Sequence, residues 1–218
     1  MSGTMSAAFL AALLLCAGQP PEAASSAPQL TPDVPCQPPS ANWHRAITED
    51  DAARLRQIRS AWVEALAQAR GDHAAEVAAG GALLDPDSAL LGPAPPPGEY
   101  DCRTIKLGTQ ATGGLTYVDY PRFRCRIAAR SGGSLSFVRL NGSQRPIGRL
   151  FPDTTRRMVF LGTVQLGDEQ RAYRYGADTD RDEVAVLERI GESRWRLVFP
   201  RPHFESRLDI IELVPRVN

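Results

Sequence analysis

The sequence lacks the short motifs by which many enzymes are recognised. It has no His-Glu-x-x-His pair, no Gly-x-Ser-x-Gly turn, and no phosphate-loop lysine after its glycine-rich stretches. Its four cysteines, at positions 16, 36, 102 and 125, form no Cys-x-x-Cys pair, which excludes zinc ribbons and thioredoxin-type redox sites. The sequence therefore predicts no catalytic residue, no metal site and no cofactor, and it favours a binding protein over an enzyme.

Long apolar runs are also missing. The run at 7–17, AAFLAALLLCA, is shorter than the roughly 20 residues that a membrane span needs, and it suits the core of a signal peptide. We therefore predict that residues 1–27 are a signal peptide and that the mature protein is periplasmic or secreted, with no membrane span. No Lys or Arg precedes Arg45, so a mobile apolar tail or a misplaced start is the alternative. A lipid anchor on Cys16 is less favoured, because Leu15 stands where a small residue is usual.

Lysine is almost absent, since all but one (Lys106) of the 25 basic residues are arginine. Net charge is zero, although residues 121–160 hold nine arginines and a single acidic residue. A balanced chain of this kind is not expected to bind nucleic acid. Residues 28–42 are rich in Pro, Ala and Ser and poor in large apolar side chains, which predicts a disordered tether.

Residues 43–98 form a predicted helical segment that ends in a Pro-rich linker. Thr48 is a good N-cap, and apolar residues then recur at helical spacing on one face, at Leu55, Ile58, Trp62 and Leu66. These patterns predict helices over about 49–70 and 73–79. The run LGPAPPPG at 91–98 is typical of a stiff linker.

From residue 99 to 218 the apolar period changes to two, which is typical of half-buried strands. Eight short strands without intervening helices predict an antiparallel up-and-down β-barrel of lipocalin-like type, with a β-sandwich as the alternative. Some strands carry apolar residues on both faces, so we expect the face of the helix that holds Trp62 to cover the barrel wall. The predicted strands are 100–107, 122–128, 134–140, 145–151, 157–166, 184–190, 194–199 and 204–214.

Cys102 and Cys125 lie on two consecutive predicted strands. Opposed side chains of antiparallel neighbours lie about 5 Å apart, which a disulfide tolerates. Disulfides persist in exported proteins, so we predict a structural Cys102–Cys125 bridge. Two buried free thiols, or a bridge to Cys36, are the alternatives.

Three polar residues are candidates for partner binding: Gln144, Arg145 and Arg149. They lie in a Gly- and Pro-punctuated segment, where a loop can present a guanidinium group to a carboxylate or phosphate. The alternative is that the arginines of this region face solvent and pair with acidic residues of 161–192. Two weaker patterns are His203 with Glu205 on one strand face, and the acidic run 178–182, which departs from a calcium loop.

Several segments resemble an uncharacterised bacterial family, the domain of unknown function 4893, over about Trp43 to Pro215. The resemblance supports the extent of the domain and implies no mechanism. A looser likeness, to exported lipocalin-type barrels, concerns the fold alone, and Gly98-Glu99-Tyr100 departs from their opening Gly-x-Trp. The segments that carry the family resemblance are 104–108, 123–127, 142–146, 148–153, 195–199 and 208–215.

These observations favour a non-enzymatic binding module of the cell envelope, holding a small apolar ligand in the barrel or a protein partner at its rim. The first alternative is an envelope enzyme whose site is assembled from distant residues. The second is an inhibitor-like or structural protein that acts through its N-terminal tether. An open cavity in the barrel would favour the ligand.

Overall fold

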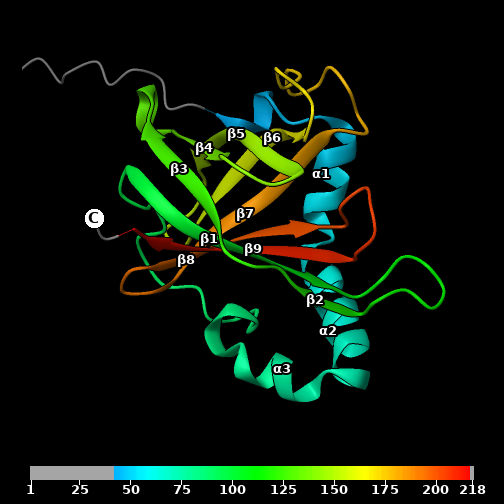
Figure 1. The fold of residues 1–218 in the computed structure, drawn as a ribbon. Helices are drawn as coiled ribbons and strands as arrows, with labels where there is room; N and C mark the ends of the chain where they lie inside the picture. Colours follow the sequence, from blue (N-terminus) through cyan, green and yellow to red (C-terminus); the bar gives the residue numbers. More distant parts are fainter. Residues whose placement is uncertain (1–41, 217–218) are drawn as a thin grey trace, which may run out of the picture. The chain divides into compact units, whose positions relative to one another are not determined.

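The computed structural model describes residues 42–216, a helical segment followed by a nine-stranded antiparallel sheet (Figure 1). The predicted signal peptide, Cys16 and the tether up to residue 41 lie outside the described residues. The helices are η1 (Trp43–Arg45), α1 (Glu49–Arg56), α2 (Ile58–Asp72), α3 (Ala74–Ala79) and η2 (Gly81–Leu83), with a further short turn η3 (Ser131–Gly133). The strands are β1 (Gly98–Leu107), β2 (Tyr117–Asp119), β3 (Phe123–Ala129), β4 (Leu135–Arg139), β5 (Gln144–Pro152), β6 (Arg157–Leu166), β7 (Asp182–Gly191), β8 (Arg194–Pro200) and β9 (Leu208–Pro215).

The sheet closes on itself, because β1 pairs with β9 as well as with β3. From β3 to β9 each strand pairs with the next along the chain, so the barrel is antiparallel, eight-stranded and up-and-down. Closure leaves the barrel without a long open edge. The predicted barrel is confirmed, and the sandwich alternative is excluded.

Two strand predictions needed correction. The three-residue β2, which pairs with the last three residues of β1, was not predicted because it is too short to show a period. The last strand begins at Leu208 rather than at 204, because residues 201–207 form a loop in which Arg201 and Glu205 have positive φ angles of 50° and 68°.

Large apolar side chains fill one end of the barrel interior. Phe160 packs edge to face against Phe137 and Phe199, and Tyr100 packs in the same way against Trp195. Two paired glycines, Gly148 and Gly162, make room for the Phe160 ring, since a Cβ at either position would lie within 2.7 Å of it. The buried interior residues are Tyr100, Cys102, Cys125, Ile127, Leu135, Phe137, Leu150, Met158, Phe160, Ala185, Leu187, Trp195, Leu197, Phe199, Ile211 and Leu213.

The helices cover the outer wall of the barrel, as expected from the strands that carry apolar residues on both faces. Trp62 on α2 is only 4% exposed and packs in one cluster with apolar residues of β1, β8 and β9, which confirms its predicted burial. Leu55 on α1 packs in another cluster with residues of β5, β6 and β7. Among the described residues, no helix is long and apolar enough to cross a membrane.

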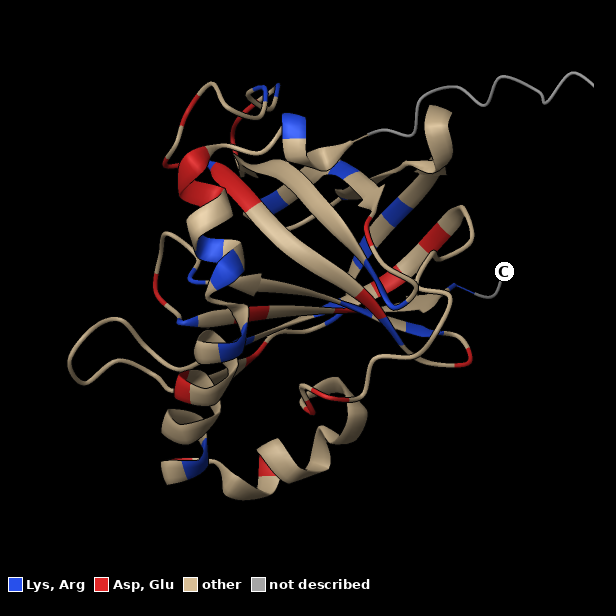
Figure 2. Ribbon diagram, turned by 180° about the vertical axis from the view of Figure 1, so that it is seen from behind, with Lys and Arg blue, Asp and Glu red and all other residues tan. Residues whose placement is uncertain are grey.

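The predicted helix 49–70 is in fact two helices with a break at Gln57, and this break lets them follow different strands of the curved wall. Thr48 caps α1 by accepting a hydrogen bond from the Asp51 amide. The acidic first turn that follows, red in Figure 2, faces the positive end of the helix dipole. The predicted helix 73–79 is present as α3.

Candidate functional site

A cavity of about 360 Å³ opens at the end of the barrel opposite the packed aromatic residues. Its size falls in the usual range for small-molecule pockets, which is about 300–1,000 Å³. Both polar and apolar side chains line it, and most belong to the inward-facing rows of the strands. The lining residues are Thr104, Lys106, Tyr120, Phe123, Arg139, Gly142, Ser143, Gln144, Pro146, Glu183, Phe199, Glu205, Asp209 and Ile211.

The cavity forms where the inward-facing side chains change from apolar to polar along the strands. On β1 the inward row runs from Tyr100 and Cys102, in the apolar core, to Thr104 and Lys106 in the cavity. Arg139 on β4, Glu183 on β7 and Asp209 on β9 are the corresponding polar residues of their strands. Neighbouring strands are antiparallel, so each mouth of the barrel is formed by the end of one strand and the start of the next. These residues lie at such strand ends and starts, and they therefore meet at one mouth.

Lys106 and two carboxylates form an ion cluster at one side of this mouth. Its ammonium group lies 2.9 Å from Asp209 Oδ2 and 3.1 Å from Glu205 Oε2. Burial alone would lower the pKa of Lys106, but the two carboxylates outweigh burial and raise that pKa. Asp209 also accepts a short hydrogen bond from the Ser206 hydroxyl. Both oxygens of Asp209 are therefore occupied within the protein.

Glu183 is the least satisfied acid in the cavity. Its Oε2 atom is shielded from solvent and has no hydrogen-bond partner among residues 42–216. Burial raises the pKa of Glu183 to about 8, and the nearby Asp209 adds to the rise. At neutral pH the carboxyl group is therefore mostly protonated, and it can donate a hydrogen bond into the cavity.

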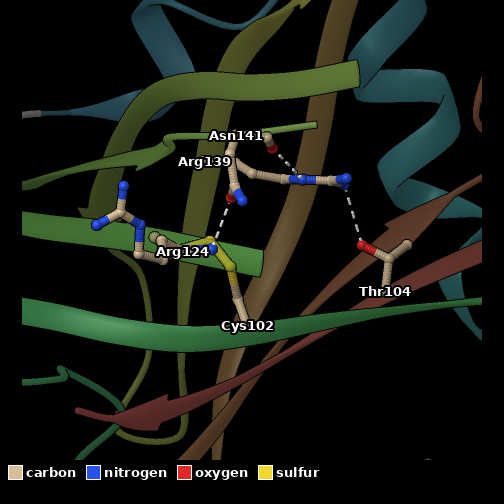
Figure 3. The surroundings of a disulfide bond; sticks show 6 residues. Cys102, Thr104, Arg124, Arg139 and Asn141 are labelled. Atoms are coloured by element: carbon tan, nitrogen blue, oxygen red, sulfur yellow. Dashed lines mark hydrogen bonds between the residues drawn. A yellow bond between two sulfur atoms is a disulfide. The ribbon is translucent and has the colours of Figure 1, made fainter. Parts of the chain in front are cut away.

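Arg139 is the second buried cation, with only 8% of the residue exposed. Its Nε donates to the Asn141 carbonyl and its Nη1 donates to Thr104 Oγ1, at 3.1 and 3.2 Å (Figure 3). The guanidinium lies 3.6 Å from the centre of the Phe123 ring. Burial lowers the pKa of Arg139 to about 10, which still leaves it charged at neutral pH.

The predicted disulfide between Cys102 and Cys125 is present next to this site (Figure 3). The two Cα atoms are 5.9 Å apart, although the cysteines are diagonal rather than directly opposite, since Cys102 pairs with Phe123 in the ladder. The bridge fixes β1 to β3 next to Thr104 and Phe123, two of the residues that contact the Arg139 guanidinium.

The three predicted partner-binding residues do not form one surface. They lie on strand β5 and not on a loop, so the expected loop presentation is wrong. Gln144 faces the cavity. Arg145 is half-buried, and its guanidinium donates to the carbonyls of four residues in the two adjoining turns. These are Gly142, Leu166, Gly167 and Glu169.

Arg149 faces outward, where it donates to Ser134 Oγ. It lines a separate groove of about 840 Å³ between the outer face of β4–β6 and residues 170–175. Arg130, Arg171 and Arg174 also line this groove, and no acidic residue does. Other arginines of the region pair as expected with acidic residues, but with different ones: Arg122 contacts Glu212, and Arg126 contacts Glu99.

The weaker patterns do not form metal sites. His203 and Glu205 lie in the loop before β9, so they do not share a strand face. His203 instead lines a hollow of about 30 Å³ beside the cavity. Asp182 is buried and accepts from the Gly176 amide, which explains the acidic run as a turn. Within the part of the chain that the structure describes, no group of three or more His, Cys, Asp or Glu is placed to hold a metal ion.

Fold and site together define a closed antiparallel barrel, packed at one end and holding a polar cavity at the other. The chain belongs to the family described as Domain of unknown function (DUF4893), whose model matches residues 43–213. No curated protein matches the chain, and no solved structure matches it.

Proposed function

We propose that this protein is an exported, non-enzymatic binding protein of the cell envelope that holds a small ligand in the mouth of its barrel. The observation that carries the proposal is the cavity itself, about 360 Å³ in volume and lined by buried charged groups. Charged groups stabilise a fold poorly at such a position, because their desolvation costs free energy that apolar side chains would not. Their presence is typical of a ligand site.

The ligand we propose is not wholly apolar, unlike the first expectation from the sequence. The apolar end of the barrel is already filled by packed rings. In the cavity, Phe123, Phe199 and Ile211 offer an apolar wall, while Arg139 and Glu183 offer polar contacts. A small molecule with one apolar part and one polar group fits this lining.

The envelope location remains a proposal that two observations support. The apolar run at 7–17 suits a signal peptide, and the Cys102–Cys125 disulfide suits an oxidising compartment. Intact mass of the protein from the periplasm or medium tests it. We expect a chain shortened by 18 to 27 residues, whereas a full-length chain in the cytoplasm would contradict the proposal.

Ligand binding can be tested with a fragment panel that has neutral, anionic and cationic members in equal share. The readout is the NMR shift of the Ile211 methyl group, which lines the cavity, with the Ile190 methyl in the helix-covered cluster as internal reference. We expect some fragments to shift Ile211 alone. Gln144→Trp, which places an indole in the mouth, should abolish these shifts.

A control variant separates blocking of the mouth from a general effect of the added indole. Val63→Trp adds the same ring on α2, at a position 58% exposed and outside the cavity lining. It should bind fragments as the wild type does. If no fragment shifts Ile211, or if both variants bind equally well, the proposed function is wrong.

A protein partner is a second candidate, and the arginine groove favours it. The groove holds Arg149 and three other arginines without an acidic neighbour in its lining, so an acidic segment of a partner would meet complementary charge. Isothermal titration with polyglutamate tests this. Arg149→Ser with Arg174→Ser should weaken binding, while Arg124→Ser with Arg70→Ser, away from the groove, should not. Equal loss in both pairs would exclude the groove.

A further inference from the structure

The two buried cations of the cavity differ in their partners. Lys106 is neutralised within the protein, because it contacts the carboxylates of Asp209 and Glu205. Arg139 has no carboxylate within 4.0 Å in the described part of the chain, and both of its hydrogen bonds go to neutral oxygens. Arg139 is thus the one cation in the cavity lining whose charge no direct partner offsets.

Arg139 is also held in a fixed orientation with one nitrogen left over. Its Nε and Nη1 atoms are bound to Asn141 and Thr104 (Figure 3). The Phe123 ring lies against the guanidinium plane. Nη2 makes no hydrogen bond within residues 42–216 and lies against Gly142, where a Cβ would come within 2.5 Å of it. A glycine at position 142 therefore makes room for this nitrogen of the guanidinium group.

The acids of the cavity are less available to a ligand. Both oxygens of Asp209 are bound by Lys106 and Ser206. Glu205 contacts Lys106 and is largely exposed at the rim. Glu183 remains, and it lines the same cavity as Arg139 with one carboxyl oxygen that has no partner among residues 42–216. A protonated Glu183 would donate to an anion held by Arg139, whereas a bound cation would need it ionised.

We propose that Arg139 binds the carboxylate of a small, singly charged ligand whose apolar part lies against Phe123, Phe199 and Ile211. The proposal rests on the proposed function, since it names the ligand class of the same cavity. A single negative charge fits better than a phosphate dianion, because Arg139 is the one cation of the lining without a carboxylate partner and so offsets a single charge. Planar carboxylates also match the geometry of a guanidinium group.

The first test uses the wild-type protein, so that no variant needs to fold. Benzoate, benzyl alcohol and benzylamine have similar size and differ in charge. Their dissociation constants are measured from the Ile211 methyl shift. We expect benzoate to bind at least about tenfold more tightly than benzyl alcohol, since a charge-assisted hydrogen bond is worth about 1.5–3 kcal/mol. Benzylamine should bind most weakly.

The second test removes the guanidinium. Arg139→Met keeps much of the side-chain volume and should weaken benzoate about tenfold, while leaving benzyl alcohol unchanged. Arg124→Met, on the outward row of the neighbouring strand, is the matched control and should change neither. If Arg139→Met does not fold, Thr104→Val takes its place, because it removes only the acceptor that orients Nη1, and it should weaken benzoate by a smaller factor.

The outcomes separate this inference from the proposed function. If benzyl alcohol or benzylamine binds as tightly as benzoate, and Gln144→Trp blocks it, the cavity binds ligands but Arg139 does not select carboxylates. If the fragment panel yields ligands yet benzoate is not among them, the inference is again wrong. If nothing in the panel binds, both this inference and the proposed function are wrong. Loss of benzoate binding in Arg124→Met as well would also overturn it.

Discussion

The two ends of the barrel are made from the same strands and filled in opposite ways. At one end, aromatic and aliphatic side chains pack together in the interior, and the Phe160 ring meets those of Phe137 and Phe199 edge to face. At the other end the inward positions are Thr104, Lys106, Arg139 and Asp209, around an open space. The comparison shows where the fold is stabilised and where it has room for another molecule.

Two buried arginines differ in the same way as the two ends of the barrel. Arg196 lies on the outer wall beneath Trp62, fully buried, and it binds Glu188 and the carbonyls of residues 82, 83 and 85. Its bonds tie the η2 segment to β8. Arg139 is also buried but faces inward, and it has no carboxylate within 4.0 Å in the described part of the chain. Arg196 is paired with a carboxylate and fastens two segments of the structure, whereas the charge of Arg139 has no such partner among the described residues.

The largest expected effect contrasts the two ends through phenylalanine. Phe160→Ala at the packed end should lower the free energy of unfolding by about 3–5 kcal/mol, because it leaves a cavity among close-packed rings. Phe123→Ala at the mouth should cost about 1 kcal/mol, since its half-buried ring already borders open space. Urea unfolding measures both. Equal losses would show that the mouth contributes to stability as the packed end does.

The arginine comparison predicts a second, similar contrast. Arg196→Met should destabilise the protein by about 3 kcal/mol or more, because it leaves Glu188 and three carbonyls without their donor. Arg139→Met should cost about 1 kcal/mol or less, since it removes a desolvated charge that has no ionic partner. A larger loss of unfolding free energy for Arg139→Met than for Arg196→Met in the same urea series would show that Arg139, and not Arg196, is the structural arginine.

The disulfide joins the strands at the border between the two ends. Replacing Cys102 and Cys125 by Ala should lower stability by about 3 kcal/mol on the loop-entropy model, for a sequence separation of 23 residues. Non-reducing peptide mapping shows whether the bridge forms in the native protein. Free thiols at both positions, in protein taken from the envelope, would remove this support for export.

The smallest expected effect concerns the Glu183 proton. Its pKa is raised by folding to about 8, so the folded protein holds a proton that the unfolded chain releases at lower pH. The free energy of unfolding should therefore fall as pH rises from about 4.5 to 8. Glu183→Gln removes this contribution, so it should stabilise the protein relative to the wild type at pH 9 and do so much less at pH 5. A difference between variant and wild type that does not change with pH would contradict the raised pKa.

Much of the fold could be predicted from local patterns. The alternation at Phe123, Cys125 and Ile127 placed those side chains inside, and the helical spacing at Leu55 and Trp62 identified the face that covers the wall. The alternation of Arg194 and Arg196 with the apolar residues of the same strand would place Arg196 on the solvent side. It is buried because α2 and η2 cover that face, and this covering depends on tertiary contacts that a strand period does not contain.

The cavity was missed, although the sequence carried a signal for it. Arg139 shares the parity of Leu135 and Phe137, and Asp209 shares that of Ile211 and Leu213, so each is a polar residue on an inward row. Single cases of this kind have many explanations. Their meeting at one mouth depends on strand order, direction and closure, which come only from the pairing of distant strands. Of the predicted binding residues, Gln144 alone lines the cavity.

The most direct test of the account asks whether the native protein carries a small molecule. Protein purified from its native cells under non-denaturing conditions would be weighed by native mass spectrometry, beside Gln144→Trp and Val63→Trp prepared in the same way. We expect a small bound mass on the wild type and on Val63→Trp that is absent from Gln144→Trp. Two results would contradict the claim that the barrel mouth is a ligand site. One is a wild-type protein that carries no bound mass, and the other is a bound mass that Gln144→Trp retains in full.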